Sequence, residues 1–373
     1  MKIGIVTSIK APYRTLQIEE ICKNKNIDIC VYYTKKGKED RDWEVRNSIL
    51  FKEEYLDNIN LFERFGTLNK GLRKIVKENE VIFIGGYEKP TYILLSLLCR
   101  IYKKKYVIIF DGISCNKLTQ KENKAKWFLK SLVIKYSSAI WGNGTVSKRY
   151  FNEKFNYPIN KIYNQYLTVD GEKIDQIRKN KIKVRKELRD RYDIKENEII
   201  LQYSGRLTEV KNVKLIIKAL SRIKDKSIKL FITGGGKQEQ ELKLLAEKLG
   251  INLIITGFID NQEELFKHYF ISDIFVLASI YEPWGLVVNE AMYAELPALV
   301  SNICGCSLDL VQEGINGFTF NPYDYEDLAL KINNVLEDKD KMSKESRNII
   351  NKYSFKNSSN MFHQILNNEI KVI

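Results

Sequence analysis

The hydrophobic positions of the chain gather in short, nearly continuous runs of β-branched and aromatic residues. In the first half these runs are KIGIVTSI, IDICVYYT, VIFIGG, YVIIFDG and SAIWGNG, which begin at Lys2, Ile27, Val81, Tyr106 and Ser138. Continuous apolar runs are typical of buried parallel strands, whereas a half-exposed antiparallel sheet alternates. Helical patterns lie between most of these runs, for example over 16–25 and 90–102. The pattern predicts a parallel sheet with crossover helices.

The same rhythm restarts after a charged stretch over 173–195. The second set of runs is EIILQYSGR, IKLFITGGG, LIITGF, DIFVLAS and ALVSN, which begin at Glu198, Ile228, Leu253, Asp273 and Ala298. The helices between them are about 10 to 14 residues long, as in right-handed βαβ crossovers. We therefore expect an α/β chain with two doubly wound domains, over 1–168 and 175–350, and a further amphipathic helix in the tail.

Parallel sheets of this kind bind ligands beyond the carboxyl ends of their strands. The polar residues that directly follow each predicted strand are therefore the candidates for chemistry. Two such domains facing each other would form a cleft, which would suit a reaction with two substrates.

Composition narrows the class of protein. Of the 373 residues, 44% are hydrophobic and 29% are charged, which is enough apolar material for two cores. No run approaches the ~18 apolar residues of a membrane span, and the first residues read as a strand and not as a secretory signal. The six cysteines form no C-x-x-C pair, and two histidines argue against a catalytic triad or a metal centre. We expect a cytoplasmic protein with reduced cysteines and no membrane-spanning segment.

The motif SGRLTEVKN follows a predicted strand directly. Gly205 permits a tight turn, Arg206 projects from that turn, and Lys211 comes five residues later near the start of a helix. Two cations at a helix entrance form an anion site, and arginine can bind phosphate oxygens through two hydrogen bonds. Taken alone, the motif fits equally well a turn with two solvated cations.

The motif EPWGLVVNE follows another predicted strand. Glu282 lies in the loop, Trp284 and Gly285 turn the chain, and Leu286 opens an apolar helix that carries Glu290. Backbone N–H groups at such a turn can bind phosphate, and carboxylates can accept hydrogen bonds from sugar hydroxyls. The alternative is one surface glutamate and one on a helix face.

Glycines follow two more strands of the second half. Gly235 lies in ITGGGK, and Gly257 with Phe258 closes a short strand. Neither segment has the spacing of a P-loop or of a dinucleotide fingerprint. Such turns let a nucleotide approach the backbone, although each is a weak signal by itself.

Together these motifs resemble the donor half of retaining glycosyltransferase family 4, which has the GT-B fold. The order Arg206 with Lys211, then GGG, then Glu282 and Glu290 within EPWGLVVNEAM matches that family from about 198 to 327. The resemblance extends more loosely over the whole chain. It implies two Rossmann-like domains across a cleft, with 354–373 crossing back to the N-terminal domain.

The resemblance also implies roles and substrates. Arg206 and Lys211 would neutralise the diphosphate of a nucleotide-sugar, Glu282 would touch the transferred sugar, and Glu290 would hold the ribose. Backbone groups and glycines would flank the diphosphate, ribose and base; these are Gly205, Gly235, Gly257, Phe258, Trp284, Gly285 and Leu286. Cations and N–H donors aimed at a departing diphosphate stabilise the transition state, so no metal or other cofactor is required. UDP-linked donors are favoured, and GDP-linked donors are the alternative.

Acceptor residues are harder to identify in the first half. The candidates follow its predicted strands and are Pro12, Tyr13, Arg14, Tyr87 and Asp111. Many family members have a histidine near the reacting sugar, but this chain has none before His268. We expect Asp111 to take that place, either orienting the acceptor or accepting its proton. The resemblance implies a glycan or lipid-linked acceptor in surface polysaccharide or glycoconjugate assembly.

Two D-x-D triplets, Asp40 to Asp42 and Asp338 to Asp340, resemble a metal motif of another glycosyltransferase fold. Neither triplet follows an apolar strand, and both lie among lysines. We interpret them as solvated charge.

Charge is unevenly distributed along the chain. The net charge is +14, and residues 101–150 hold 11 Lys/Arg against 2 Asp/Glu, which gives +9. The segment 117–136 combines lysines with Trp127, Phe128 and Leu129, a pattern that can lie on an anionic membrane. The alternative is an ordinary helix that buries this face against a sheet. We expect a peripheral position at the inner face of the cytoplasmic membrane.

Two other functions fit parts of the sequence. Another GT-B enzyme, such as a sugar-nucleotide epimerase or a soluble glycoside synthase, would have a similar donor site. A basic nucleic-acid-binding protein would account for the net charge and the 21 tyrosines. However, the charge is not organised in a recognisable nucleic-acid module, so we expect no nucleic-acid partner.

Overall fold

The computed structural model describes residues 1–373 except 25, 38–45, 60–67, 226 and 371–373. The chain divides into two compact units. The first comprises 1–112, 118–167 and 355–373, and the second comprises 113–117 and 168–354. The short segment 113–117, which we placed in the first domain, therefore groups with the second unit.

The first unit contains a parallel sheet of seven strands in the order β3-β2-β1-β4-β5-β6-β7. The strands are β1 Lys2–Thr7, β2 Asp28–Tyr33, β3 Lys52–Tyr55, β4 Val81–Ile84, β5 Lys105–Phe110, β6 Ala139–Gly142 and β7 Ile162–Asn164. The helices are α1 Pro12–Cys22, α2 Leu72–Glu78, α3 Pro90–Ile101, α4 Lys124–Lys135, α5 Gly144–Phe155 and α14 Phe355–Ile365. A π-helical turn over Leu366–Ile370 follows α14.

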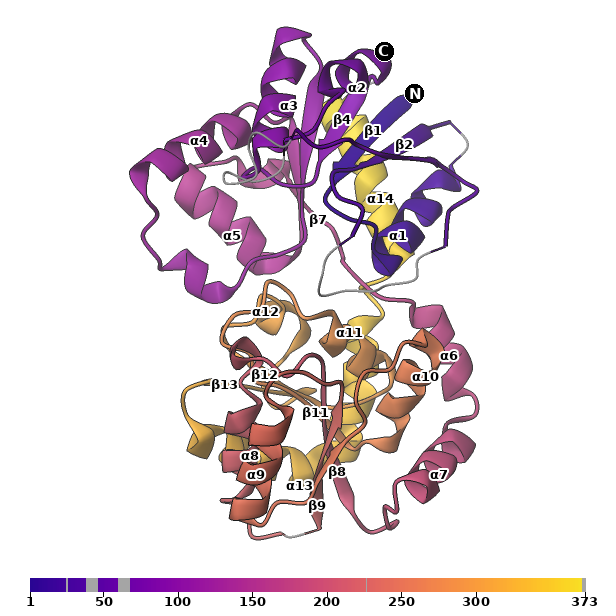
Figure 1. Cartoon of the computed structure of the whole chain (residues 1–373), viewed down its shortest axis with the longest axis vertical. Coiled ribbons are helices and arrows are strands. Elements are labelled where there is room, and N and C mark those ends of the chain that lie inside the picture. The colour runs from indigo at the N-terminus through magenta and orange to yellow at the C-terminus, as the bar shows by residue number, and fades with distance from the viewer. Residues whose placement is uncertain (25, 38–45, 60–67, 226, 371–373) are drawn as a thin grey trace. The chain divides into compact units, whose positions relative to one another are not determined.

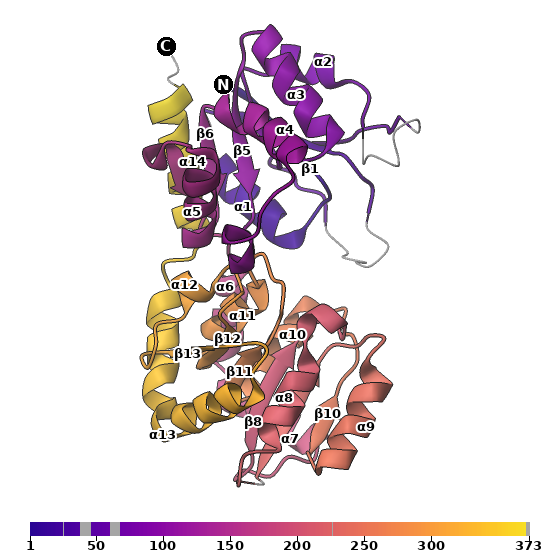
Figure 2. The ribbon, with the colours of Figure 1, turned by 90° about the vertical axis from the view of Figure 1, so that its left-hand side faces the viewer.

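The second unit repeats this topology with six parallel strands in the order β10-β9-β8-β11-β12-β13. The strands are β8 Ile199–Ser204, β9 Ile228–Thr233, β10 Leu253–Ile255, β11 Ile274–Leu277, β12 Ala298–Ser301 and β13 Gly317–Phe320. The helices are α6 Gly171–Arg178, α7 Lys181–Arg191, α8 Val213–Leu220, α9 Glu239–Leu249, α10 Gln262–Lys267, α11 Leu286–Tyr293, α12 Ser307–Leu310 and α13 Tyr325–Ile350. Helices α8 and α9 lie side by side, with α13 next to α8 (Figure 2).

Both sheets have the strand order of a Rossmann fold, in which the order reverses at one point. That point lies between β1 and β4 in the first sheet and between β8 and β11 in the second. The predicted class, α/β with two Rossmann-like domains, is confirmed. Loops at the carboxyl ends of these strands are where such folds bind ligands, so the topology brings the predicted motifs of each unit to one edge of its sheet.

The C-terminal helix belongs to the first unit. Helix α14 packs along α1, so the yellow end of the chain lies beside its indigo beginning (Figure 1). Phe362 is fully buried and stacks on Phe83 with ring centroids 4.5 Å apart. It also meets Trp141 edge-on at 5.4 Å. Together α1 and α14 cover one face of the first sheet with apolar side chains.

The charged stretch over 173–195, which broke the strand rhythm, folds as α6 and α7. Arg189 of α7 is 1% exposed and donates to the carbonyl of Lys195 at 2.7 Å. Its guanidinium also reaches Asp273, which accepts from Arg185 as well. Several charges of this stretch therefore anchor α7 to β11, which explains why an apolar pattern did not reveal the helices.

Candidate active site

The backbones of two loops meet closely at the carboxyl edge of the second sheet. A Cβ added at Gly234 would lie 2.1 Å from the carbonyl oxygen of Gly205, and one added at Gly236 would lie 2.6 Å from that of Leu207. The Leu207 amide donates to the carbonyl of Gly235 at 2.9 Å. Gly205, Gly234 and Gly236 all have positive φ, from 136° to 156°. The loops after β8 and β9 therefore approach each other more closely than residues with a Cβ atom would permit.

The predicted cations lie on this edge. Arg206 follows Gly205, and its side chain is exposed. Its carbonyl accepts a hydrogen bond from the Tyr203 hydroxyl at 2.9 Å, which fixes the loop. Lys211 ends a 3₁₀ turn over Glu209–Lys211, immediately before α8. Both cations therefore come from one loop, as the motif predicted.

Glu282 lies within reach of the same loop. Its carboxylate forms an ion pair with the Lys211 ammonium group, and both side chains are largely buried, at 14% and 21% exposed. The Glu282 carbonyl accepts from the amide of Gly305 at 2.9 Å, which ties the loop after β11 to the loop after β12. The structure thus brings together two groups that are 71 residues apart, and each compensates the charge of the other.

The turn between Glu282 and α11 is shaped by Trp284 and Gly285. Trp284 is 3% exposed and donates from its indole to Asn289 at 2.9 Å. Gly285 precedes the helix with φ of 106°, and a Cβ there would lie 2.9 Å from a Leu277 methyl group. The first N–H groups of α11, beginning at Leu286, have no partner within the helix and form an electropositive end.

Glu290 lies one turn further along α11 and is half-buried. The Tyr269 hydroxyl donates to Glu290 Oε2 at 2.5 Å. Burial raises the pKa of Glu290 to about 7, against the opposing effect of this hydrogen bond. A carboxylate with such a pKa is partly protonated at neutral pH, so its hydrogen-bond partners decide how well it accepts from a ligand.

Two further donor candidates lie on the same edge. Gly257 forms an isolated bridge with Gly234 and has φ of 76°. Phe258 beside it is 67% exposed, which is unusual for a phenylalanine and leaves its ring open to a planar partner. Gly235 lies about 3.8 Å from the backbone of both, measured from an added Cβ. The predicted donor residues are therefore assembled from the loops after β8, β9, β10 and β11.

In the first unit, three acceptor candidates form one cluster. The Tyr13 hydroxyl donates to Asp111 Oδ2 at 3.1 Å, and the Arg14 guanidinium forms an ion pair with the other carboxylate oxygen. Arg14 is buried, with its side chain 5% exposed, whereas the side chain of Asp111 is 43% exposed. Pro12, which directly precedes Tyr13, begins α1. Two neighbouring side chains therefore fix the position of Asp111, while part of its own side chain remains exposed.

Tyr87 is wrongly placed among the acceptor candidates. It is 3% exposed, stacks on Phe110 at 5.5 Å and meets Phe151 edge-on at 5.7 Å. Its position after β4 suggested a loop residue facing a ligand. The aromatic side chains of the neighbouring strand and of α5 enclose it instead, so it is a core residue.

The loop over 8–14, a candidate acceptor segment, has polar neighbours at this edge that were not singled out from the sequence: Glu53, Tyr33 and Lys89. Lys10, in the loop after β1, donates to Glu53 at 2.8 Å, and both side chains are nearly buried. Tyr33 donates to the second oxygen of Glu53 at 2.8 Å, and Lys89 donates to Ser8 at 2.7 Å. Lysines and glutamates of this kind look like surface charge in a sequence, and only the sheet order places them together.

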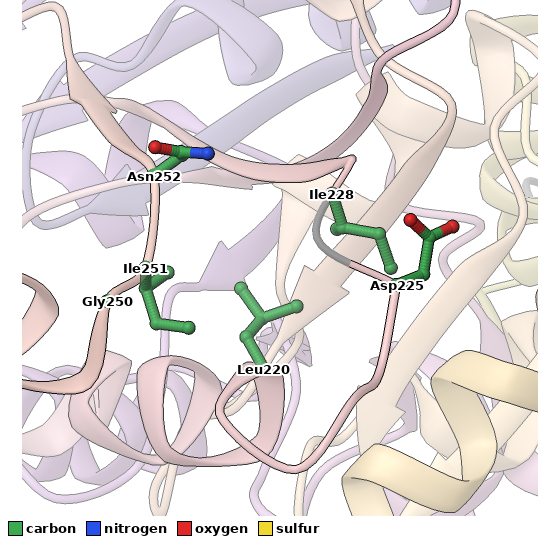
Figure 3. A pocket seen from close by; sticks show the side chains of 6 residues that line it. All are labelled: Leu220, Asp225, Ile228, Gly250, Ile251 and Asn252. Atoms are coloured by element: carbon green, nitrogen blue, oxygen red, sulfur yellow. The ribbon is translucent and has the colours of Figure 1, made fainter.

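A surface depression in the second unit lies away from these motifs. Its lining residues come from the carboxyl ends of α8 and α9 and the amino ends of β9 and β10 (Figure 3); they are Leu220, Asp225, Ile228, Gly250, Ile251 and Asn252. Sheets of this kind bind ligands at the carboxyl ends of their strands, whereas this depression lies at the amino ends. This depression is therefore not part of the candidate site.

The described part of the chain offers no group of three or more His, Cys, Asp or Glu that could hold a metal ion. Asp338 and Asp340 are exposed near a kink in α13, and Lys339 between them pairs with Asp273 at 3.4 Å. The other triplet, Asp40 to Asp42, lies outside the described residues. Outside the masked segments, none of the helices combines the length and apolar character that crossing a bilayer requires.

Within the basic segment 117–136, residues Lys124–Lys135 form α4, and the apolar side chains of its first half are exposed, whereas the ordinary alternative expected them to be buried against the sheet. Trp127, Phe128 and Leu129 are 42%, 58% and 48% exposed. Trp127 is held in place because its indole donates to the carbonyl of Lys154 at 3.0 Å. Val133 and Ile134, at the end of the helix, are the residues that enter the core.

Known glycosyltransferases resemble part of this chain in sequence. A sequence model described as "Glycosyl transferases group 1" matches residues 184–356, which carry all the second-unit motifs. This segment is therefore similar in sequence to the group 1 glycosyltransferases. An uncharacterized glycosyltransferase of Methanocaldococcus jannaschii is 32% identical over 148 residues, 39% of this chain and 37% of that protein. A lipopolysaccharide 1,2-N-acetylglucosaminetransferase of Salmonella typhimurium is 27% identical over 197 residues, 48% of this chain and 51% of that protein. The sequence matches thus span about a third to a half of these relatives.

A crystal structure of HepE from Anabaena, in complex with UDP, resembles the whole chain. The TM-score is 0.78 at 17% sequence identity, over 98% of this chain and 100% of HepE. At this identity the likeness concerns the fold, and it confirms the GT-B class with its two Rossmann-like domains. The group 1 glycosyltransferase match and the GT-B fold were both expected from the motifs.

We predict that Gly234→Ala disrupts the carboxyl edge of the second sheet. Its Cβ would lie 2.1 Å from a backbone oxygen that no side-chain rotation can move, so we expect a loss of about 3 kcal/mol or more in the free energy of unfolding. Gly257→Ala is the matched control, because its φ is also positive but no atom lies within 4 Å of an added Cβ. The control should lose about 1 kcal/mol. Chemical denaturation of both variants tests this, and equal losses would contradict it.

Proposed function

We propose that this protein is a retaining, metal-independent glycosyltransferase. It transfers a sugar from a nucleotide-diphospho-sugar, with UDP as the favoured carrier, to a glycan or lipid-linked acceptor. The observation that carries the proposal is the convergence of Arg206, Lys211, Glu282 and Glu290 on one edge of the second sheet, within the segment that matches the glycosyltransferase family.

The chemistry follows from the charges on that edge. As the bond between the anomeric carbon and the diphosphate breaks, negative charge develops on the departing oxygen. Arg206, Lys211 and the first N–H groups of α11 stabilise that charge more in the transition state than in the ground state. Because cations and N–H donors are already present, no divalent metal takes part in the proposed reaction.

The two glutamates take different parts of the donor. Glu290 accepts from the ribose hydroxyls, and Glu282, held by Lys211, accepts from hydroxyls of the transferred sugar. Phe258 and the glycines beside it flank the base. The UDP complex of HepE, whose fold this chain shares, supports a uridine nucleotide as the donor carrier.

Asp111 of the first unit takes the acceptor. Since Arg14 and Tyr13 already hold its two oxygens, we assign it an orienting role: it accepts a hydrogen bond from an acceptor hydroxyl. A new bond forms from that acceptor oxygen to the anomeric carbon, and the hydroxyl proton passes to the departing diphosphate. Retention of the anomeric configuration is part of this proposal.

We place the reaction in surface polysaccharide or glycoconjugate assembly, at the inner face of the cytoplasmic membrane. The Salmonella relative acts on lipopolysaccharide, which supports a membrane-linked acceptor. Helix α4 adds exposed Phe128 and Leu129 to the most basic part of the chain, and the neighbouring α3 adds Leu97 and Ile101, which are 40% and 72% exposed. Apolar side chains with lysines around them bind anionic bilayers.

We expect one nucleoside diphosphate among UDP, GDP, CDP and ADP to stabilise the protein against thermal unfolding. A ligand at 100 times its dissociation constant adds about 2.7 kcal/mol. UDP should give this effect with and without a chelator, and Arg206→Ala should abolish it, since the diphosphate would lose its guanidinium partner. No response to any of the four, together with salt-sensitive binding of nucleic acid, would contradict the proposal.

Asp111→Asn is the matched control for this experiment, because it alters the other unit. This variant should keep the full stabilisation by UDP but transfer sugar about tenfold or more slowly. Transfer at the parent rate would remove Asp111 from the reaction while leaving the donor site in place.

We expect Phe128→Glu to weaken binding to vesicles that contain phosphatidylglycerol, because it places a negative charge in the exposed apolar part of α4. Ile182→Glu is the control, since Ile182 is 83% exposed on α7 of the second unit. Co-sedimentation should show a loss for the first variant alone, and no binding to vesicles of phosphatidylcholine. Equal binding by both variants and the parent would exclude α4 from membrane contact.

A further inference from the structure

We infer that Tyr269 is a positioning residue for Glu290 and thereby determines how the protein recognises the ribose of its donor. The inference rests on the proposed nucleotide site. It assigns a function to a residue that the sequence motifs do not include, since Tyr269 lies in an apolar stretch, HYFI, that precedes β11.

The geometry sets Tyr269 apart from an ordinary core tyrosine. It is fully buried, in a 3₁₀ turn over His268–Ile271, and its hydroxyl donates to Glu290 Oε2 at 2.5 Å. This is the hydrogen bond that the structure gives to that carboxylate among the described residues. The other oxygen, Oε1, is not among the buried atoms that lack a partner, and Glu290 is half-buried. One oxygen is thus held by Tyr269, and the other is not fully buried.

A hydrogen bond of this kind does two things for a ribose-binding glutamate. It fixes a side chain with three rotatable bonds, so less conformational entropy is lost when the ligand binds. It also favours the ionised carboxylate, which can accept from hydroxyls at both oxygens, whereas the acid cannot. Burial raises the pKa of Glu290, and the hydrogen bond from Tyr269 lowers it. The hydrogen bond therefore offsets part of the effect of burial.

The surroundings of Tyr269 keep its hydroxyl group protonated, so that it can donate a hydrogen bond. Burial and the adjacent Glu290 carboxylate raise the pKa of the Tyr269 phenol, so it stays protonated across the physiological range. Ser204 and Tyr203, both from β8, also affect the pKa of this phenol: Ser204 lowers it and Tyr203 raises it. The tyrosine therefore lies near the end of β8, which leads into the Arg206 loop, and bonds to the helix that carries Glu290.

Other charged groups near α11 lie at its C-terminal end. On α6 and α13, Arg178 pairs with Glu295 at 2.7 Å, and Arg347 pairs with Asp175 at 2.7 Å. Arg347 lies 4.9 Å from the centre of the Tyr293 ring, and neither pair is among the groups that shift the pKa of Glu290. The ionisation of Glu290 therefore depends chiefly on burial and on Tyr269.

The test is the affinity for UDP as a function of pH in Tyr269→Phe. Loss of the donor raises the pKa of Glu290 further above its ordinary value, so less of the carboxylate is ionised at pH 7. We expect binding about tenfold weaker at that pH, since a hydrogen bond to a charged group is lost. The deficit should shrink as the pH rises from 7 to 9, because Glu290 ionises again. A structural defect would give a loss that does not change with pH.

Two controls isolate the effect. Tyr293→Phe removes another buried hydroxyl from the same unit, which donates to the carbonyl of Tyr353 at 2.8 Å, and should keep the parent pH profile. With 2′,3′-dideoxyuridine diphosphate, which lacks the ribose hydroxyls, parent and Tyr269→Phe should bind alike. The titration of the diphosphate itself is common to all variants and cancels in the ratio.

The outcomes separate this inference from the proposed function. If the parent binds UDP but Tyr269→Phe has the same pH profile, the positioning role is wrong and the donor site stands. If the deficit persists with the dideoxy ligand, Tyr269 does not act through ribose recognition. If the parent binds no nucleoside diphosphate, the proposed function fails first.

Discussion

The close backbone contact between the loops after β8 and β9 is the constraint on which the donor site depends. Gly234 and Gly205 approach so closely that no side chain fits between them, and Gly236 repeats this against Leu207. This contact lets the loops form one continuous backbone surface at the carboxyl end of the second sheet. Arg206 and Lys211 belong to the first of these loops, and the turn before α11 is joined to it by the ion pair between Glu282 and Lys211.

Charged side chains form ion pairs both at the carboxyl edge of the second sheet and around Asp111 in the first unit. Lys211 is paired with Glu282 in the second unit, and Arg14 is paired with Asp111 in the first. A partly buried charge is costly without such a partner, and a paired one is already oriented before a ligand arrives. In the proposed reaction, the diphosphate would meet a lysine that is already oriented, and sugar hydroxyls would meet carboxylates that do not have to reorganise. The buried hydrogen bond from Tyr269 to Glu290 extends the same arrangement to a third group.

The central strands of both sheets could be predicted because burial on two faces leaves a continuous apolar run. Three edge strands, β3, β7 and β13, gave no such signal: KEEY is mostly polar, IYN is three residues long, and GFTF is half-exposed. The donor motifs could be found because each follows a strand, and topology then brings them together. Which polar residues pair across a sheet edge, such as Lys10 with Glu53, depends on strand order and could not be predicted from the sequence.

The surroundings of two tyrosines could not be predicted from the sequence. Tyr87 follows a strand as a ligand-binding residue would, but aromatic neighbours from other elements enclose it. Tyr269 lies in an apolar stretch as a core residue would, but its hydroxyl meets a carboxylate 21 residues away. In both cases the deciding contact is with an element distant in sequence.

The central claim is that the carboxyl edge of the second sheet binds a nucleoside diphosphate. Hydrogen–deuterium exchange with and without UDP tests it most directly, because exchange reports the protected backbone without relying on a variant. We expect protection over 205–212, 234–238 and 282–290, and none at the depression around Asp225 and Asn252. Protection elsewhere with these three segments unchanged would contradict it.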